Sequence, residues 1–222
     1  MEYLLNDYTV FGDKDILTQV SNISNEINDG YYEGQYTKQI NDVIKNLCNN
    51  KNINTFFLTA GTQTNALVLS ALLKPYEAII SADTAHINFL EAGSIENLGH
   101  KIVALQSNNG KINANDIKNC VDVHNDKHKV CPKVVYISQP TEVGTMYTEN
   151  ELLELRKVCD EHNLQLYLDG ARLCVALAKN KNLTLEKYAN LIDTFYFGGT
   201  KNGLPLGEMV ITKNTDFAKD FK

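Results

Sequence analysis

YLDGAR (residues 167–172) and GGTKNG (residues 198–203) are the two motifs that decide the fold of this chain. Each follows or closes an apolar run with the composition of a buried strand, QLYLD in the first case and TFYFGG in the second. Asp169 therefore lies at the mouth of one expected strand, and Lys201 lies just beyond another. In open α/β sheets, ligands bind outside the carboxyl ends of the strands, so these two side chains mark a candidate site.

An aspartate and a lysine in these positions meet two chemical requirements of pyridoxal phosphate. A lysine amine forms a Schiff base with the cofactor aldehyde, and a carboxylate keeps the pyridinium nitrogen protonated so that the ring accepts electrons. A strand-end aspartate and an exposed lysine are each common, so neither motif decides the matter alone. Together, in this order, they make an enzyme that uses pyridoxal phosphate the leading interpretation.

Composition limits the other classes of protein. The 222 residues are 43% hydrophobic, enough for one substantial core, and the net charge of −6 argues against nucleic acid or a membrane surface as the main partner. No apolar run is long enough to span a bilayer, and we see no secretory signal at the N-terminus. The five cysteines are odd in number and form no CxxC pair, which is typical of reduced thiols in a cytoplasmic protein.

Strand and helix signals alternate along the chain. Apolar runs predict seven strands, at 54–59, 77–81, 101–105, 133–138, 165–169, 194–199 and 208–212. Helical signals occupy the segments 15–28, 35–48, 64–73, 87–97, 113–122 and 148–162. Thr148, with Glu151 three residues later, forms a capping box that begins the last of these helices. We therefore predict a single α/β domain, a mostly parallel seven-stranded sheet with helices on both faces.

Polar residues follow most of the predicted strands. Gly61 and Thr62 stand between a strand and a helix, where backbone N–H groups suit a phosphate, although any tight strand–helix turn has this pattern. His86 could lie flat on a cofactor ring, or it could be structural. Arg172 could bind a carboxylate or a phosphate, or it could be a surface residue of a helix. The other candidates at strand ends are Gln139, Thr141 and Thr200.

The sequence motifs of several other enzyme classes are absent. GxSxG, a P-loop and GxGxxG do not occur, so hydrolase, NTPase and dinucleotide-binding interpretations have no motif. His124 and His128 are four residues apart, a spacing that suits a metal on one helix face. They stand in the charged stretch DVHNDKHKV, which favours a solvated loop, and we predict no metal site.

The chain resembles the low-specificity threonine aldolases of the aromatic amino acid β-eliminating lyase/threonine aldolase family, which have fold type I of the pyridoxal phosphate enzymes. The resemblance extends from LLNDYTV (4–10) through EMVIT (208–212). Its most specific blocks are FLTAGTQTNALVLSALL, ADTAHINFLEAGSIENLGHKI, SQPTEVGTMYTENELLELRKVCDEHNLQLYLDGARL and FYFGGTKNG. It implies the large cofactor-binding domain over residues 1–222, with an N-terminal arm at 1–30 and without the family's small C-terminal domain.

The resemblance also implies roles for individual residues. Lys201 would be the Schiff-base lysine, Asp169 would pair with the pyridine nitrogen, and His86 would stack on the ring. The phosphate and substrate would be held by the other matching positions: Gly61, Thr62 and Thr200 for the cofactor, and Asn6, Tyr31 and Arg172 for the substrate. The family's sites form between subunits, so a homo-oligomer, a dimer or a tetramer, is expected.

The implied reaction is a retro-aldol cleavage of L-threonine, allo-threonine and related β-hydroxy amino acids to glycine and an aldehyde. A base, either His86 through a water or the cofactor phosphate, would remove the β-hydroxyl proton before the Cα–Cβ bond breaks. Two alternatives remain at this point. The same scaffold could catalyse β-elimination, with pyruvate and ammonia as products, or the chain could be an inactive remnant that retains the motifs.

Overall fold

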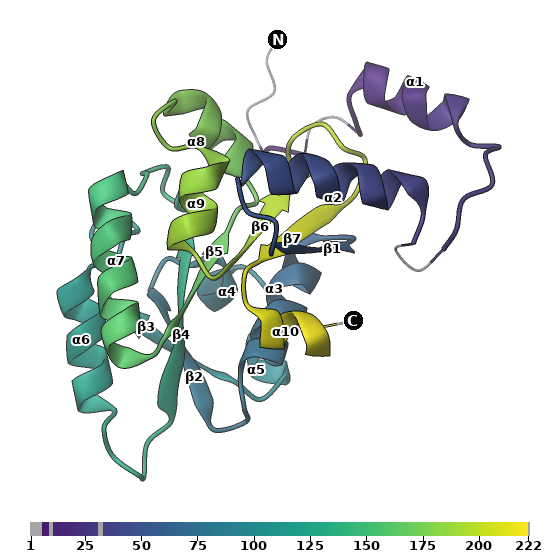
Figure 1. Cartoon of the computed structure of the whole chain (residues 1–222). Helices are drawn as coiled ribbons and strands as arrows, with labels where there is room; N and C mark the ends of the chain where they lie inside the picture. Colours follow the sequence, from purple (N-terminus) through teal and green to yellow (C-terminus); the bar gives the residue numbers. More distant parts are fainter. Residues whose placement is uncertain (1–5, 9–10, 31–32, 222) are drawn as a thin grey trace.

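A seven-stranded sheet is the centre of the computed structural model, which describes residues 6–8, 11–30 and 33–221 (Figure 1). The order of the strands across the sheet is β1-β7-β6-β5-β4-β2-β3. The strands are β1 (Asn54–Leu58), β2 (Glu77–Ala82), β3 (Lys101–Leu105), β4 (Cys131–Ser138), β5 (Gln165–Asp169), β6 (Thr194–Gly198) and β7 (Glu208–Thr212). All seven predicted strands are confirmed, with ends that differ by at most two residues.

One strand runs against the others. The pairs β3–β2, β2–β4, β4–β5 and β5–β6 are parallel, whereas β7 is antiparallel to both β6 and β1. Because β7 is reversed, β1 points the same way as β6, and its carboxyl end lies at the same edge of the sheet. The first residue of β7, Glu208, reaches this edge too, since it pairs with Leu58 at the end of β1 and with Gly198 at the end of β6.

Helices cover both faces, as the sequence predicts (Figure 1). They are α1 (Lys14–Asn22), α2 (Gln35–Leu47), α3 (Gly61–Leu72), α4 (His86–Phe89), α5 (Ser94–Asn97), α6 (Ala114–Val123), α7 (Glu149–His162), α8 (Leu173–Lys179), α9 (Leu185–Leu191) and α10 (Thr215–Asp220). The predicted capping box at Thr148 and Glu151 begins α7. No helix in the described part of the chain combines the length and apolarity needed to cross a membrane.

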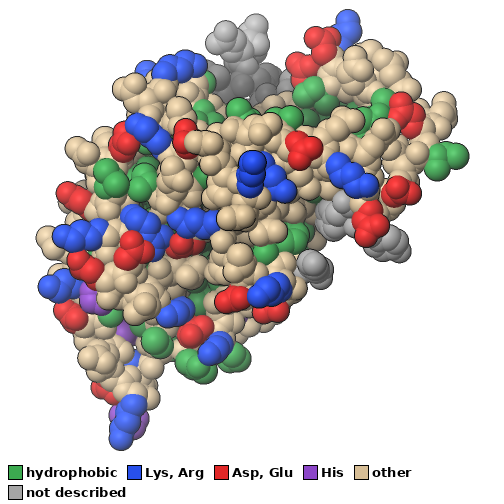
Figure 2. All heavy atoms as spheres, viewed as in Figure 1, with side chains coloured by type: hydrophobic (Ala, Val, Ile, Leu, Met, Phe, Trp, Pro, Cys, Tyr) green, Lys and Arg blue, Asp and Glu red, His purple; other side chains and the backbone are tan. Residues whose placement is uncertain are grey.

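Alternate strand residues divide the core into two layers. On β5, Leu166 and Leu168 pack in one layer with α6, α7, α8 and α9, while Tyr167 between them packs in the other with α3, α5 and α10. This alternation follows from the period of two along a strand, and both layers are apolar because helices cover both faces. On the face shown in Figure 2, side chains of both charge signs are interspersed over the helices.

Two predicted helices differ from the structure. The segment expected as one helix at 87–97 forms two short helices, α4 and α5, because Ala92 (φ 51°) and Gly93 (φ 75°) adopt left-handed backbone between them. A right-handed helix cannot continue through such residues. The segment expected as a helix at 15–28 ends at Asn22, and the residues that follow it to 30 lie exposed beside no apolar layer. Helices α8, α9 and α10 were not predicted, since each is seven residues or fewer.

Candidate active site

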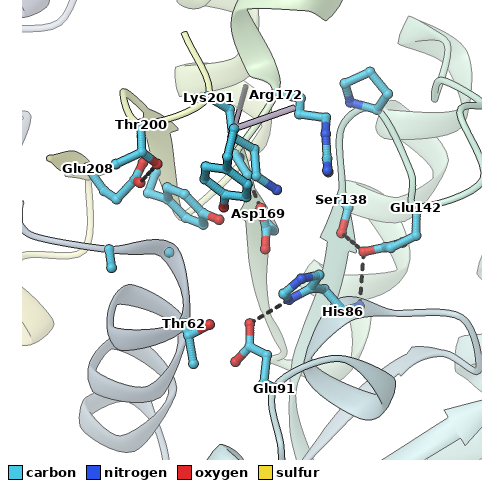
Figure 3. Close-up of a pocket in the computed structure, with 16 residues that line it drawn as sticks. Thr62, His86, Glu91, Ser138, Glu142, Asp169, Arg172, Thr200, Lys201 and Glu208 are labelled. Atoms are coloured by element: carbon cyan, nitrogen blue, oxygen red, sulfur yellow. Dashed lines mark hydrogen bonds and ion pairs between the residues drawn. The ribbon is translucent and has the colours of Figure 1, made fainter. Parts of the chain in front are cut away.

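The carboxyl edge of the sheet encloses a cavity of about 160 Å³ (Figure 3). Its walls come from the ends of β1, β4, β5 and β6, from α4 after β2, and from the start of β7. Seven of the residues predicted from the sequence line it: Gly61, Thr62, His86, Asp169, Arg172, Thr200 and Lys201. Asn6 is exposed and does not line the cavity, and Tyr31 lies outside the described residues.

Asp169 forms the floor of the cavity at the end of β5, and 5% of the residue is exposed. Its Oδ2 accepts hydrogen bonds from the Tyr136 hydroxyl at 2.6 Å and from Asn65 Nδ2 at 3.0 Å. Its Oδ1 accepts one from the backbone N–H of Ala171 at 3.0 Å. The Tyr196 side chain also hydrogen bonds to this carboxylate, so several donors hold Asp169 in place at the cavity wall.

Lys201 brings an amine to the same cavity, with 8% of its side chain exposed. Burial, followed by the positive charge of Arg172, lowers the pKa of Lys201 below its usual range, although the charges of Asp7 and Asp169 oppose this shift. A lysine with a lowered pKa is more often neutral, and the neutral amine is the nucleophile. The ring of Tyr8 lies 5.0 Å from Nζ.

The first turn of α3 faces the cavity through Gly61 and Thr62. Ala60 precedes this turn and makes no side-chain cap hydrogen bond, so this residue caps none of the first backbone N–H groups of the helix. A side-chain carbon on Gly61 would lie 3.2 Å from the Tyr196 hydroxyl, which is tighter than ordinary contact. A small residue therefore lets the helix start approach β6 closely, and such a helix start attracts anions.

His86 is the first residue of α4 and joins two acidic side chains. Its backbone N–H donates to Glu142 Oε1 at 3.0 Å, and its Nδ1 contacts Glu91 Oε1 at 2.8 Å. Glu142 also accepts from the Ser138 hydroxyl at 2.6 Å, and burial raises the pKa of Glu142. The histidine is therefore held at both its backbone and its ring, by residues from two different connections.

Several lining residues were not predicted from the sequence. Glu208 at the start of β7 accepts from Thr200 Oγ1 at 2.6 Å and from the Gly199 N–H at 3.0 Å, and burial raises its pKa. It fixes the turn that carries Lys201. In the sequence, Glu208 is visible as the acidic residue that begins the apolar run EMVIT. Only an antiparallel β7 brings that residue to this edge of the sheet.

The connection after β4 contributes different residues from those predicted. Gln139 is fully buried and faces the core, where its side chain bonds to the backbone of Tyr147 and to the Tyr188 hydroxyl. Thr141 bonds to Thr145 instead of facing the cavity. Ser138, Pro140 and Glu142 are the lining residues of this connection. The neighbours of the predicted residues therefore reach the site in their place.

Known proteins resemble this chain closely. Residues 20–220 match the family described as Beta-eliminating lyase. The low specificity L-threonine aldolase of Pseudomonas aeruginosa is 35% identical over 194 residues, which is 86% of this chain and 56% of the relative. The alanine racemase TOXG of Cochliobolus carbonum is 31% identical over 159 residues, 70% of this chain and 40% of that protein. The chain thus spans about half the length of the curated relatives that it matches.

A solved structure agrees with the fold. The threonine aldolase of Leishmania major superposes with a TM-score of 0.93 at 38% sequence identity, over 96% of this chain and 62% of that one. The matched region includes the strands and turns that build the cavity, since nearly the whole chain is covered. By its match over residues 20–220, the chain belongs to the beta-eliminating lyase family.

Proposed function

We propose that this protein is a pyridoxal phosphate-dependent lyase that cleaves L-threonine, allo-threonine and related β-hydroxy amino acids to glycine and an aldehyde. The observation that carries the proposal is the convergence of Lys201, Asp169 and the start of α3 on one cavity. The threonine aldolases among the relatives support the reaction type. The family description names a lyase that acts by β-elimination.

The residues of the cavity fit pyridoxal phosphate. Lys201 offers an amine whose lowered pKa favours the neutral form, and the neutral form reacts with an aldehyde. Asp169 offers a nearly buried carboxyl group in the cavity wall as the partner of a ring N–H. The start of α3 offers N–H groups for a phosphate, with Thr62 beside it. When bound there, the cofactor would supply an electron sink for the bond that breaks.

The chain's own residues would then bind the substrate and move its protons. Arg172 lines the cavity and would hold the substrate carboxylate, as its guanidinium already holds the carboxylate of Asp7. His86 would accept the β-hydroxyl proton, directly or through a water. Loss of that proton turns the C–O bond into the aldehyde carbonyl as the Cα–Cβ bond breaks, and a proton returned to Cα completes glycine.

The first test is a visible absorption spectrum of the purified protein with added pyridoxal phosphate, followed by borohydride reduction and peptide mapping. We expect an absorption band that reduction converts into a stable adduct on Lys201. Lys201→Ala should lose the adduct and remain folded, whereas Lys157→Ala, at a lysine with 79% of its side chain exposed, should keep it. An adduct on another lysine, or none on folded protein, contradicts the assignment.

Product analysis separates the candidate reactions. Incubation with L-threonine should release glycine and acetaldehyde in equal amounts. Pyruvate or ammonia from a β-substituted substrate would instead indicate β-elimination, and loss of optical activity from alanine would indicate racemisation, which the name of one relative describes. A homo-oligomer and a cytoplasmic location remain predictions, the first of which light scattering can test.

A further inference from the structure

Glu91 is a buried acidic residue in the wall of the cavity, and its side chain has no exposed surface. Its carboxylate accepts three hydrogen bonds from side chains: His86 Nδ1 at 2.8 Å, Asn65 Nδ2 at 2.8 Å and Ser94 Oγ at 3.0 Å. A buried carboxylate is tolerated only with such partners, because burial without them costs several kcal/mol, on the order of 2–7 even for a neutral polar group. The three partners come from α3, α4 and α5.

Asn65 links Glu91 to the floor of the cavity. Its Nδ2 also donates to Asp169 Oδ2 at 3.0 Å, and its Oδ1 accepts from the Tyr167 hydroxyl at 2.9 Å. A reversed amide would turn its oxygen toward two carboxyl groups, so the direction of these bonds follows from the partners. Asn65 therefore donates to both Glu91 and Asp169 and holds the Glu91 carboxylate where it can accept from His86.

The hydrogen bond between His86 and Glu91 decides where the imidazole proton lies. An ionised carboxylate can only accept, so Nδ1 of His86 must donate to it (Figure 3). In the neutral ring only one nitrogen carries a proton, which leaves Nε2 as an acceptor. The His86 side chain is 28% exposed and lines the cavity, and Nε2 is the ring nitrogen left for a group bound there.

We propose that Glu91 is a positioning residue that holds the neutral His86 with its proton on Nδ1, so that Nε2 serves as the proton acceptor of the cavity. The use of Nε2 in catalysis rests on the proposed function. The tautomer itself does not, because it depends only on contacts within the chain.

The electrostatics around the ring agree with this arrangement. The hydrogen bond that His86 donates to Glu91 raises the pKa of His86, against the opposing effect of burial. The charged groups that act on the ring are Glu91 after α4, Asp169 at the end of β5 and Lys201 after β6, while Glu142 after β4 accepts from the backbone N–H of His86. Asp169 adds to the rise and Lys201 reduces it. A raised pKa makes Nε2 a stronger base at neutral pH than an ordinary imidazole.

The test is ¹⁵N NMR of protein labelled in its histidine rings, recorded without cofactor across a range of pH. In the wild type we expect the neutral ring of His86 to carry its proton on Nδ1 and to titrate above the ordinary value of about 6.5. His86→Gln assigns the signals. A neutral ring protonated on Nε2 would overturn the proposal, and this measurement on the wild type needs no variant at Glu91.

Two variants separate the charge of Glu91 from its acceptor oxygen. Glu91→Gln keeps an acceptor for Nδ1 and for Asn65, so the Nδ1–H tautomer should persist while the pKa of His86 falls. Glu91→Leu removes the acceptor, so the two tautomers should mix. Glu96→Gln, at an exposed residue of α5, should change neither. If Glu91→Leu does not fold, Glu91→Gln decides, and an unchanged pKa of His86 in that variant contradicts the proposal.

The same samples distinguish this inference from the proposed function. Failure of pyridoxal phosphate to attach to Lys201 would contradict the proposed function and leave the tautomer result intact. Attachment to Lys201 in a protein whose His86 carries its proton on Nε2 would contradict the positioning role alone. Loaded enzyme adds one readout: in Glu91→Gln, the acidic limb of the pH profile of threonine cleavage should move to lower pH, with the pKa of His86.

Discussion

Asp7 places both of its carboxylate oxygens against the guanidinium of Arg172. Oδ2 contacts Nε, Oδ1 lies 3.2 Å from Nη2, and Oδ1 is also 3.9 Å from Nζ of Lys201. Burial alone would raise the pKa of Asp7, but the hydrogen bond from Arg172 and the charge of Lys201 lower it. The resemblance pointed to Asn6 in this segment, whereas it is the next residue that contacts two side chains lining the cavity.

Asp7→Asn should lower the pKa of Lys201 further. The negative charge of Asp7 raises that pKa, and the neutral amide removes this contribution while Arg172 continues to lower it. Since only the neutral amine reacts with an aldehyde, the rate at which pyridoxal phosphate joins Lys201 should reach half of its maximum at a lower pH. Stopped-flow absorbance across pH measures this midpoint.

The control for this prediction is Asp15→Asn, an exposed carboxylate of the same N-terminal segment. It should leave the midpoint where the wild type has it. A midpoint that moves to higher pH in Asp7→Asn would mean that Asp7 acts mainly by keeping the amine out of water.

Asp169→Asn should weaken the binding of pyridoxal phosphate by about 10- to 100-fold. A hydrogen bond to a charged group contributes about 1.5–3 kcal/mol, and the amide provides no negative charge for the ring nitrogen. Titration followed by the absorbance of the cofactor gives the dissociation constant. Asp126→Asn, at an exposed loop carboxylate, is the matched control. Equal affinities of the two variants for pyridoxal phosphate would rule out Asp169 as the partner of the ring nitrogen.

Leu155→Ala should destabilise the fold by about 2–5 kcal/mol without changing the site. Leu155 is 1% exposed on the inner side of α7, in the layer that packs against β4 and β5. Leu153 on the same helix is 49% exposed, so Leu153→Ala should change the free energy of unfolding by less than about 0.5 kcal/mol. Urea unfolding of both variants tests whether the core lies where the structure puts it.

Gly170→Ala should disrupt the joint between β5 and β6. A side-chain carbon on Gly170 would overlap the backbone oxygen of Tyr196, and the carbonyl of Gly170 also accepts the N–H of Gly198 at 3.0 Å. Backbone cannot move aside as a flexible side chain can, so we expect a loss of about 1–3 kcal/mol or more, or no folded protein. Gly30→Ala, where no atom of the described residues lies within 4 Å of the new carbon, should be tolerated, and thermal unfolding compares the two.

Much of this fold follows from the sequence because each strand is a short apolar run between turn residues. The two motifs with Asp169 and Lys201 stand at strand ends, and parallel strands bring such ends to one edge. Every parallel strand contributes its carboxyl end to the same edge, so the sequence predicts that these residues share one cavity, whatever the order of the strands.

The residues that were missed depend on long-range geometry. Glu208 reaches the cavity only because β7 is antiparallel, and Tyr8 lines it only because the N-terminal segment returns to Arg172 through Asp7. Gln139 was predicted in place of its neighbours because the direction of a side chain in an irregular connection has no period to read. The break between α4 and α5 begins at Ala92, whose positive φ has no signature in the sequence, and the signal that could have shown it was the next residue, Gly93.

The pairing of β1 with β7 affects the order in which the protein can form during synthesis. β1 occupies residues 54–58, yet its partner in the sheet is β7 at residues 208–212. Strands β2 to β6 therefore leave the ribosome before β1 can pair with β7. The turn after β1 carries Gly61 and Thr62, and it gains its position only with that pairing. A nascent chain would therefore acquire the apolar layers of β2 to β5 first, and the wall of the cavity formed by Gly61 and Thr62 would be completed only after residue 212 has left the ribosome.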